Sequence, residues 1–349
     1  MKRIGNLYQQ AFTRDALLAA FHAAARNKRG KRACFNFERR LACNLDALFC
    51  ELRDGTYRPM PYYNFEVYEP KQRTIYAPAF RDLVVQHAVY AAVNAIFDRT
   101  FIDQSFACRK GMGTHKASDY AQAALRASPR DGYTLKIDIR KFFYRIDRTI
   151  LRRLIERKIK DNRMVDAMMQ FADHGEPLGI PIGNLLSQLY ALIYLNPLDH
   201  YIKRELKVRL YCRYVDDGVL FGLTKSECAE ARTRIETFIQ DNLHLEYSHT
   251  TLAPVRKGVN FVGYRTWASK RFIRKRSLYV FRKAIREDDM QCAVSLLGHA
   301  RNTSSLRNML CQIPKEMINE NHCIQKIQGQ INYANTRPAY CQNRTDDWH

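Results

Sequence analysis

Two adjacent aspartates, Asp216 and Asp217, lie between two short apolar runs of the chain. The two runs predict the strands of a hairpin, which would place both acids at its tip. Neighbouring carboxylates repel each other and lose hydration, so a cation is needed to offset the cost. A third acid, Asp138, stands at the end of another apolar run, 133–139. Carboxylates on adjacent strands can hold paired Mg²⁺ ions, which is what two-metal phosphoryl transfer requires.

The order of the predicted elements would lay these acids in one sheet. The expected elements are a strand at 133–139, a helix at 148–160, a helix from Asn184 to 207, the hairpin, a helix capped by Ser226 and ending at 241, and a strand at 260–264. This order predicts a βαββαβ-like open sheet with helices on one face, and hence an α+β fold.

The region before this sheet is predicted to be mainly helical. Residues 8–53 form two amphipathic stretches broken by a basic cluster at 26–32. Alternating residues at 62–77 predict a strand hairpin with Lys71 and Arg73 at or near its tip. Two further helices are expected at 81–98 and 117–127.

Composition favours a polyanionic partner. The 349 residues carry a formal net charge of +22, while 46% hydrophobic content allows a real core. No apolar run approaches the roughly 20 residues that span a bilayer, so a membrane partner is not expected. The N-terminus has no apolar signal core, and the ten cysteines include no C-x-x-C pair. A cytoplasmic protein with reduced thiols and no zinc site is therefore expected.

One segment, 247–286, holds eleven Lys and Arg residues, seven aromatic residues and no Asp or Glu. A basic run alone usually marks a solvated face. A run without any acid and with aromatic side chains between the charges fits a surface that follows a phosphate backbone. Contact with nucleic acid is therefore expected here.

Several motifs together resemble those of reverse transcriptases. The matching segments, in chain order, are Lys71 and Arg73 in the hairpin, 135–143 around Asp138, the loop and helix start at 179–188, Tyr-Val-Asp-Asp at 214–217, and Phe-Val-Gly-Tyr at 261–264. The resemblance covers about residues 35–300. Motifs in the family's order are far more specific than any one of them.

The resemblance implies a right-hand polymerase with fingers, a ferredoxin-like palm (an antiparallel sheet plus helices) and a helical thumb. The implied domains are a basic helical N-terminal extension at 1–34, fingers at 35–130, palm at 131–264 with 148–178 partly in the fingers, and thumb with C-terminal tail at 265–349. The implied activity is RNA-directed DNA polymerisation, with template RNA, a cDNA or primer strand and dNTPs as ligands.

The loop-helix motif indicates a subfamily. An aliphatic residue, Ile182, precedes Gly183, and Gln188 ends the motif, where intron-type enzymes have Q-G-x-x-x-S-P. This pattern resembles the reverse transcriptases of diversity-generating retroelements. That resemblance implies error-prone copying opposite adenines and a partner, a small basic helical accessory protein expected to be oligomeric.

The resemblance also assigns roles to individual residues. Asp138 and Asp216 would ligate two Mg²⁺ ions, with Mn²⁺ as a possible substitute, while Asp217 and the Ile139 carbonyl assist. Phe143 would exclude a 2′-hydroxyl while Phe142 packs in the core. The remaining nucleotide-binding residues would be Lys71, Arg73, Ile182, Gly183 and Gln188. The primer or template would contact Tyr214, Gly263, Tyr264, Arg274, Lys275 and Arg276.

Other interpretations of the sequence stay open. The chain could be a group II intron-like or retron reverse transcriptase, although its last 70 residues lack the Cys or His pairs of a nuclease. It could also be a non-catalytic RNA-binding scaffold, against which the three intact acids argue. His249 is either a surface residue or a proton donor to pyrophosphate.

Overall fold

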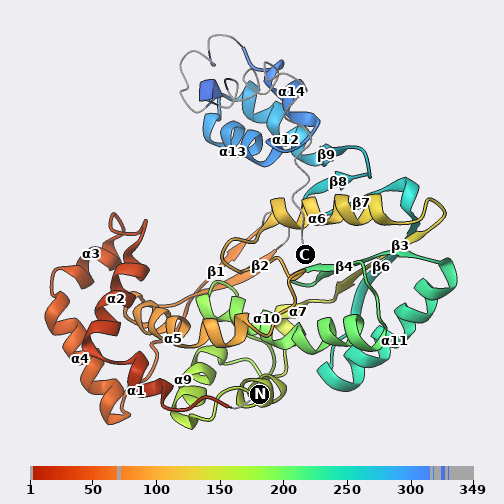
Figure 1. The fold of residues 1–349 in the computed structure, drawn as a ribbon. Coiled ribbons are helices and arrows are strands. Elements are labelled where there is room, and N and C mark those ends of the chain that lie inside the picture. Colours follow the sequence, from red (N-terminus) through yellow and green to blue (C-terminus); the bar gives the residue numbers. More distant parts are fainter. Residues whose placement is uncertain (1–2, 69–71, 315–316, 318–323, 327–328, 330–349) are drawn as a thin grey trace, which may run out of the picture. The chain divides into compact units, whose positions relative to one another are not determined.

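The computed structural model describes residues 3–68, 72–314, 317, 324–326 and 329. The chain divides into two compact units, one of residues 1–117 and 132–253 and the other of 118–131 and 254–349 (Figure 1). The α+β class expected from the sequence is confirmed, because antiparallel sheets and helices occur together. In the described part of the chain, no helix has both the length and the apolar character needed to cross a membrane.

The first unit opens with helices that pack around one buried helix. These are α1 (Leu7–Ala11), α2 (Arg14–Ala25), α3 (Arg32–Glu38), α4 (Leu41–Asp54) and the central α5 (Phe80–Asp98). Helix α5 buries Val84, Val85, Val89 and Val93 and contacts α1, α2, α3 and α10. The expected helices at 8–53 and 81–98 are thus confirmed.

The predicted strand hairpin at 62–77 is also confirmed. Strands β1 (Tyr63–Val67) and β2 (Arg73–Ala77) pair antiparallel, from Tyr63 opposite Ala77 to Val67 opposite Arg73. Lys71, expected near the tip, lies outside the described residues.

A four-stranded sheet forms the centre of the first unit. Its strands are β3 (Tyr133–Ile139), β4 (Tyr211–Tyr214), β5 (Asp217–Leu223) and β6 (Tyr247–Pro254), in the order β4-β5-β3-β6. The prediction that the last strand is 260–264 was wrong, since β6 takes that place. Strand β6 lies at an edge and is largely exposed, so its polar sequence lacks the alternation that marks a half-buried strand.

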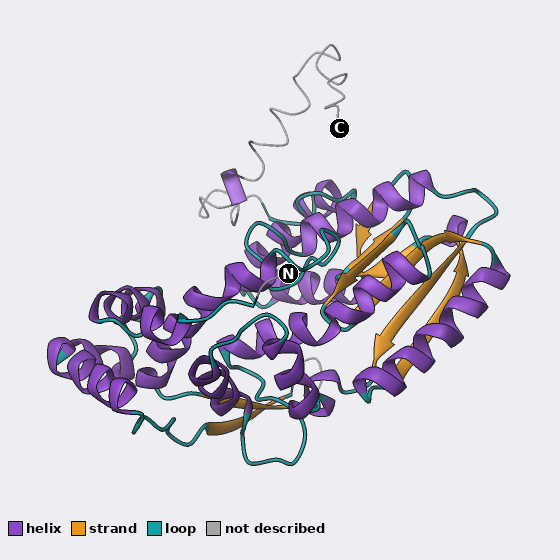
Figure 2. Ribbon diagram, turned by 60° about the horizontal axis from the view of Figure 1, so that its bottom comes forward, coloured by secondary structure: helices purple, strands orange, loops and turns teal. Residues whose placement is uncertain are grey.

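Helices of the same unit lie beside this sheet (Figure 2). They are α7 (Phe142–Arg145), α8 (Arg148–Glu156), α9 (Asn162–Ala172), α10 (Leu185–His200) and α11 (Lys225–Leu243). Helix α10 is apolar on nearly all sides and buried, whereas α11 packs on both β3 and α10. Beyond His200 the backbone continues as a π-helical turn, Tyr201–Glu205, so the regular helix ends before the predicted residue 207.

Two helix starts show how capping was predicted. The Asn184 side chain accepts a hydrogen bond from the Leu186 N–H at 2.9 Å, which confirms the predicted cap of α10. The prediction that Ser226 caps α11 was wrong. Thr224 is the cap, because its side chain accepts from the Glu227 N–H while the Glu227 carboxylate accepts from the Thr224 N–H. Such a reciprocal capping box satisfies two backbone donors at once.

The second unit combines a small sheet with helices. Its elements after Ala253 are a 3₁₀ turn (Val255–Lys257), β7 (Val259–Phe261), β8 (Tyr264–Thr266), β9 (Arg271–Ile273), α12 (Lys275–Arg286), α13 (Met290–Ala300) and α14 (Ser305–Leu310). Helix α6 (Thr114–Ala127) starts in the first unit and continues into the second. The predicted single strand at 260–264 is instead a tight hairpin, because Val262 and Gly263 adopt φ of 43° and 88°. The helical segment expected after 275 is confirmed.

Candidate active site

The pairing of β3 with β5 brings the three predicted acids together. Asp138 lies directly opposite Asp217 in the antiparallel register. The N–H of the next residue, Ile139, donates to the Asp216 carbonyl oxygen at 3.3 Å. Opposed residues in such a pair have Cα atoms about 4.5–5.5 Å apart. One end of the sheet therefore carries all three carboxylates.

Burial makes two of these carboxylates, Asp216 and Asp217, hard to ionise. It raises the pKa of Asp217 to about 6, although the Lys136 ammonium, 2.9 Å from an Asp217 oxygen, acts in the opposite direction. Burial also raises the pKa of Asp216, to which the charge of Asp138 adds and which the Arg73 guanidinium reduces. The site thus gathers negative charge at a place where water solvates it poorly.

The carboxylate oxygens at this site are the type of ligand that a hard divalent cation binds, and not all of them are hydrogen-bonded. One Asp217 oxygen is buried and has no hydrogen-bond partner in the structure. The other Asp217 oxygen accepts from Lys136, and the Ser248 hydroxyl donates to an Asp138 oxygen. Within the described residues, no three metal-binding side chains already converge on one point. A bound ion would therefore replace Lys136 and Ser248 as the partner of these carboxylate oxygens, and water and substrate would supply its remaining ligands.

The β1–β2 hairpin contacts the predicted nucleotide loop. The Tyr76 N–H donates to the Ile182 carbonyl oxygen at 2.7 Å. Gly183 has a φ of 106°, and a Cβ atom there would lie 2.8 Å from Cγ2 of Ile75. Glycine is required at this position both for the backbone conformation and for the close approach of β2. Arg73 begins β2, and its charge reaches the Asp216 carboxyl.

The same loop also contacts the short helix α7. Ile180 donates its N–H to the Phe143 carbonyl oxygen at 2.9 Å. The Phe142 ring is buried, whereas Phe143 is only partly buried, with the ring centroids 5.5 Å apart. Phe142 therefore serves the core and Phe143 keeps an accessible surface. Gln188 is exposed in the first turn of α10.

Several residues near the acids were missed in the sequence. Lys136 pairs with Asp217, and Ser248 donates to Asp138. Beneath the hairpin tip, Arg213 and Asp199 form a fully buried ion pair. A charged residue inside an apolar strand was the available signal for Arg213, because such a residue needs a buried counter-charge. His249 is exposed on β6, beside Ser248, and Tyr214 is partly buried at the end of β4.

The remaining predicted residues belong to the second unit. Gly263 lies in the β7–β8 turn, where a Cβ atom would come within 2.9 Å of the His299 ring. Tyr264 is fully buried, stacks on His299 with centroids 4.3 Å apart, and donates its hydroxyl to the His299 carbonyl oxygen. Its side chain thus serves this unit's core. Arg274, Lys275 and Arg276 are all exposed at the start of α12.

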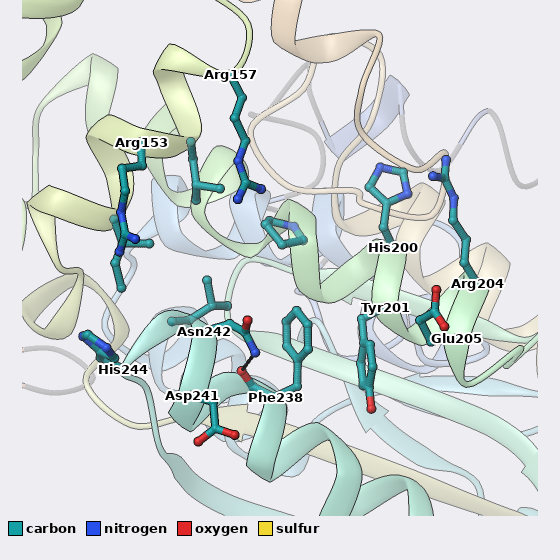
Figure 3. A pocket seen from close by; sticks show the side chains of 14 residues that line it. Arg153, Arg157, His200, Tyr201, Arg204, Glu205, Phe238, Asp241, Asn242 and His244 are labelled. Atoms are coloured by element: carbon teal, nitrogen blue, oxygen red, sulfur yellow. Dashed lines mark hydrogen bonds between the residues drawn. The ribbon is translucent and has the colours of Figure 1, made fainter. Parts of the chain in front are cut away.

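The first unit also contains a large cavity, and none of the three acids lines it. It has a volume of about 500 Å³ and is lined by residues of α8, α10, the π-helical turn and α11 (Figure 3). Arg153 and Arg157 extend from one side of it, and His200 and Arg204 lie on another. None of the predicted site residues lines this cavity.

Comparisons with known proteins agree with the geometry. A family model described as reverse transcriptase (RNA-dependent DNA polymerase) matches residues 69–266. Protein YkfC of Escherichia coli K12 is 27% identical in an alignment of 289 residues, and the match covers 69% of this chain and 74% of that protein. The group II intron-encoded protein LtrA of Lactococcus lactis subsp. cremoris is 31% identical over 170 residues, covering 45% of this chain but only 28% of its own length.

Solved structures include a similar fold. The apo telomerase of Candida tropicalis superposes with a TM-score of 0.51 at 13% identity, covering 80% of this chain and 59% of that chain. At this identity the likeness shows the fold alone.

Proposed function

The chain belongs to the reverse transcriptase (RNA-dependent DNA polymerase) family, and on that premise we propose that Asp138, Asp216 and Asp217 form its polymerase site. The observation that carries this proposal is the β3–β5 register, which sets Asp138 opposite Asp217 and ties Ile139 to Asp216. The same arrangement would serve template RNA, a primer strand and dNTPs.

The site residues would act mainly by holding charge in place. The three carboxylates and the Ile139 carbonyl would hold Mg²⁺, or Mn²⁺ in its place. When bound, such ions lower the pKa of the primer 3′-hydroxyl and neutralise the leaving pyrophosphate. Arg73 would bind the triphosphate through its planar guanidinium, together with Lys71. Exposed Gln188 and the Ile182–Gly183 loop would border the nascent base pair.

Sugar selection would fall to Phe143. Its ring retains accessible surface while Phe142 fills the core. A ring beneath the sugar clashes with a 2′-hydroxyl and so favours deoxynucleotides. His249, exposed on β6, is left with two roles, a surface residue or a proton donor to pyrophosphate.

The domains follow from this proposal. We assign the extension to 1–34, the fingers to 35–130 with part of 148–178, the palm to 131–264, and the thumb and tail to 265–349. In the thumb, exposed Arg274, Lys275 and Arg276 would bind the phosphates of primer or template. Because Tyr264 is buried, the backbone of the Gly263 turn, and not the Tyr264 ring, would touch the primer. Tyr214, beside the hairpin tip, would support the primer end.

Within the family, we propose a reverse transcriptase of a diversity-generating retroelement, working in the cytoplasm with a small basic oligomeric accessory protein. The support is Ile182 before Gly183 and Gln188 at the end of the motif. An apolar loop residue offers no hydrogen bond to nucleotide or template, and shape alone separates similar bases by about 1–3 kcal/mol. Errors opposite adenines would follow. The alternative is an intron-like enzyme, which the 31% identical intron-encoded relative favours.

Primer extension on poly(rA)/oligo(dT) tests the polymerase site. The wild type should extend the primer, and Asp216→Ala should abolish extension while leaving RNA binding intact. Asp103→Ala, a change at an exposed acid, is the matched control and should extend normally. An Asp216→Ala protein that extends as well as the control would refute the site.

Sequencing of the cDNA tests the subfamily. Ile182→Gln should lower the misincorporation rate opposite template adenines and leave errors at other bases unchanged. Ile182→Leu keeps the apolar character and is the control. Equal adenine error rates in wild type and Ile182→Gln would count against the retroelement assignment.

A further inference from the structure

Arg213 connects three separate segments around the hairpin that carries Asp216 and Asp217. Its Nε and one terminal nitrogen donate to the two oxygens of Asp199 in α10, at 2.8 and 2.6 Å. Its Nη1 donates to the carbonyl oxygen of Val215 at 2.7 Å. The remaining contact, at 3.3 Å, is to the Ser105 hydroxyl. One guanidinium thus joins a helix, the hairpin turn and a loop.

The turn that Arg213 holds is strained. Val215 adopts a φ of 55°, in the left-handed region that β-branched residues rarely occupy. Such a conformation persists only where surrounding contacts determine it. The bond from Arg213 to the Val215 carbonyl is one of these contacts, and the next two residues of the chain are the acids themselves.

The anchor beneath this bond is rigid. Both Arg213 and Asp199 are buried, and the Tyr211 hydroxyl donates to the same Asp199 carboxylate at 2.8 Å. The backbone of the loop also pairs with β4. The Arg213 N–H donates to the Gln104 carbonyl oxygen, and the Phe106 N–H donates to the Arg213 carbonyl oxygen, each at 3.0 Å. A guanidinium fork fixed at both carboxylate oxygens has little freedom to turn.

We propose that Arg213 is a positioning residue, which uses the buried Asp199 carboxylate as its anchor to fix the Val215 turn and so place the Asp216 and Asp217 carboxylates. This inference rests on the proposed polymerase function. A buried ion pair adds little net stability over apolar residues of similar size, so the bond from Arg213 to the Val215 carbonyl oxygen, rather than stability, carries this assignment. Lysine could not replace it, since one ammonium cannot reach Asp199 and Val215 as a planar fork does.

The test separates geometry from stability. In the variant Arg213→Met/Asp199→Leu/Tyr211→Phe, apolar groups replace the whole buried network, so the melting temperature should stay near that of wild type. In primer extension, kcat should fall about 100-fold, the loss that a misplacement of about 1 Å causes, with the KM for dNTP within about twofold of wild type. Amide exchange at 215–217, measured without metal or substrate, should be about tenfold faster.

A second variant covers the case in which the triple change does not fold. Arg213→Lys keeps the charge and should fold, lower kcat about tenfold and speed exchange at 215–217. Arg234→Met/Glu230→Leu removes an exposed ion pair of 3.3 Å on α11 and should match wild type in every measurement. Wild-type kcat and wild-type exchange in a folded Arg213 variant would overturn the proposal. Because exchange needs no catalysis, an inactive wild type would refute the proposed function and leave this test intact.

Discussion

Arg213 and the arginines that line the large cavity, all in the first unit, differ in what balances their charge. Arg213 is buried and meets both oxygens of a buried carboxylate, Asp199. Arg153, Arg157 and Arg204 line the 500 Å³ cavity, are exposed, and have no ion pair among the residues that the structure describes. They lie in the last turn or at the end of α8 and of the π-helical turn.

The difference follows from the surroundings. A helix end carries about half an elementary charge, which an exposed arginine and water can balance without fixed geometry. A buried guanidinium needs a full counter-charge in a fixed position. Disturbing the buried arginine should therefore lower the free energy of unfolding strongly, whereas replacing the exposed ones should change it little.

The largest effect is expected when the buried pair loses one partner. Asp199→Ala leaves the Arg213 charge uncompensated and should lower the free energy of unfolding by about 3–5 kcal/mol. Urea unfolding measures this. Asp166→Ala, which removes an exposed partner of Arg152 at 2.7 Å, is the control and should cost no more than about 1 kcal/mol. Similar losses in both variants would erase the contrast between buried and exposed pairs.

Replacing Asp217, one of the three acids of the proposed polymerase site, should stabilise the protein. Burial raises the pKa of Asp217 to about 6 from its ordinary value of 3.8, so ionising it in the folded state costs stability. This cost grows between pH 4 and 6 and levels off at higher pH. In metal-free buffer, Asp217→Asn should therefore raise the free energy of unfolding by about 2–3 kcal/mol at pH 7.

The pH dependence is the control for this prediction. At pH 4 the wild-type carboxyl is already protonated in the folded state, so Asp217→Asn and wild type should unfold at nearly the same urea concentration. Asp103→Asn, at an exposed acid, should shift neither measurement. A gain that is equal at pH 4 and pH 7 would mean that the pKa shift is not its cause.

A smaller effect is expected at Gly183. Alanine there would have an unfavourable φ of 106° and a Cβ atom 2.8 Å from Ile75, so unfolding should become about 1–3 kcal/mol easier. Gly55→Ala shares the positive φ, at 74°, but meets no atom within 4 Å and isolates the backbone contribution. Thermal unfolding should rank Gly183→Ala below Gly55→Ala. The reverse order would show that β2 yields easily at this contact.

The smallest effects are expected at the cavity arginines. Arg153→Gln, Arg157→Gln and Arg204→Gln should each lower the free energy of unfolding by at most about 1 kcal/mol, the usual size of a charge at a helix end. High salt should reduce these losses further, whereas the loss in Asp199→Ala should persist, because buried charges are screened little. A loss above about 2 kcal/mol at any of the three would show that it is structural.

The sequence predicts those features that depend on neighbouring residues. The acid pair flanked by apolar runs predicts the β4–β5 hairpin, and Asn184 before an apolar helix predicts its cap. The true cap of α11 was also visible, since Thr224 and Glu227 have capping-box spacing. Edge strand β6 was missed because its exposed polar residues carry no period. The Arg213–Asp199 pair could not be predicted, because it depends on how α10 packs beneath β4.

The contact between the β1–β2 hairpin and the Ile182–Gly183 loop has a consequence for how a nucleotide would be captured. The 2.7 Å bond from Tyr76 to Ile182 and the missing side chain at Gly183 leave no slack between the two segments. In the proposed function, a displacement of Arg73 toward a triphosphate would therefore also move the loop that we assign to the side of the new base pair. Binding of the phosphates by Arg73 and contact of the loop with the base pair would then be coupled in one movement.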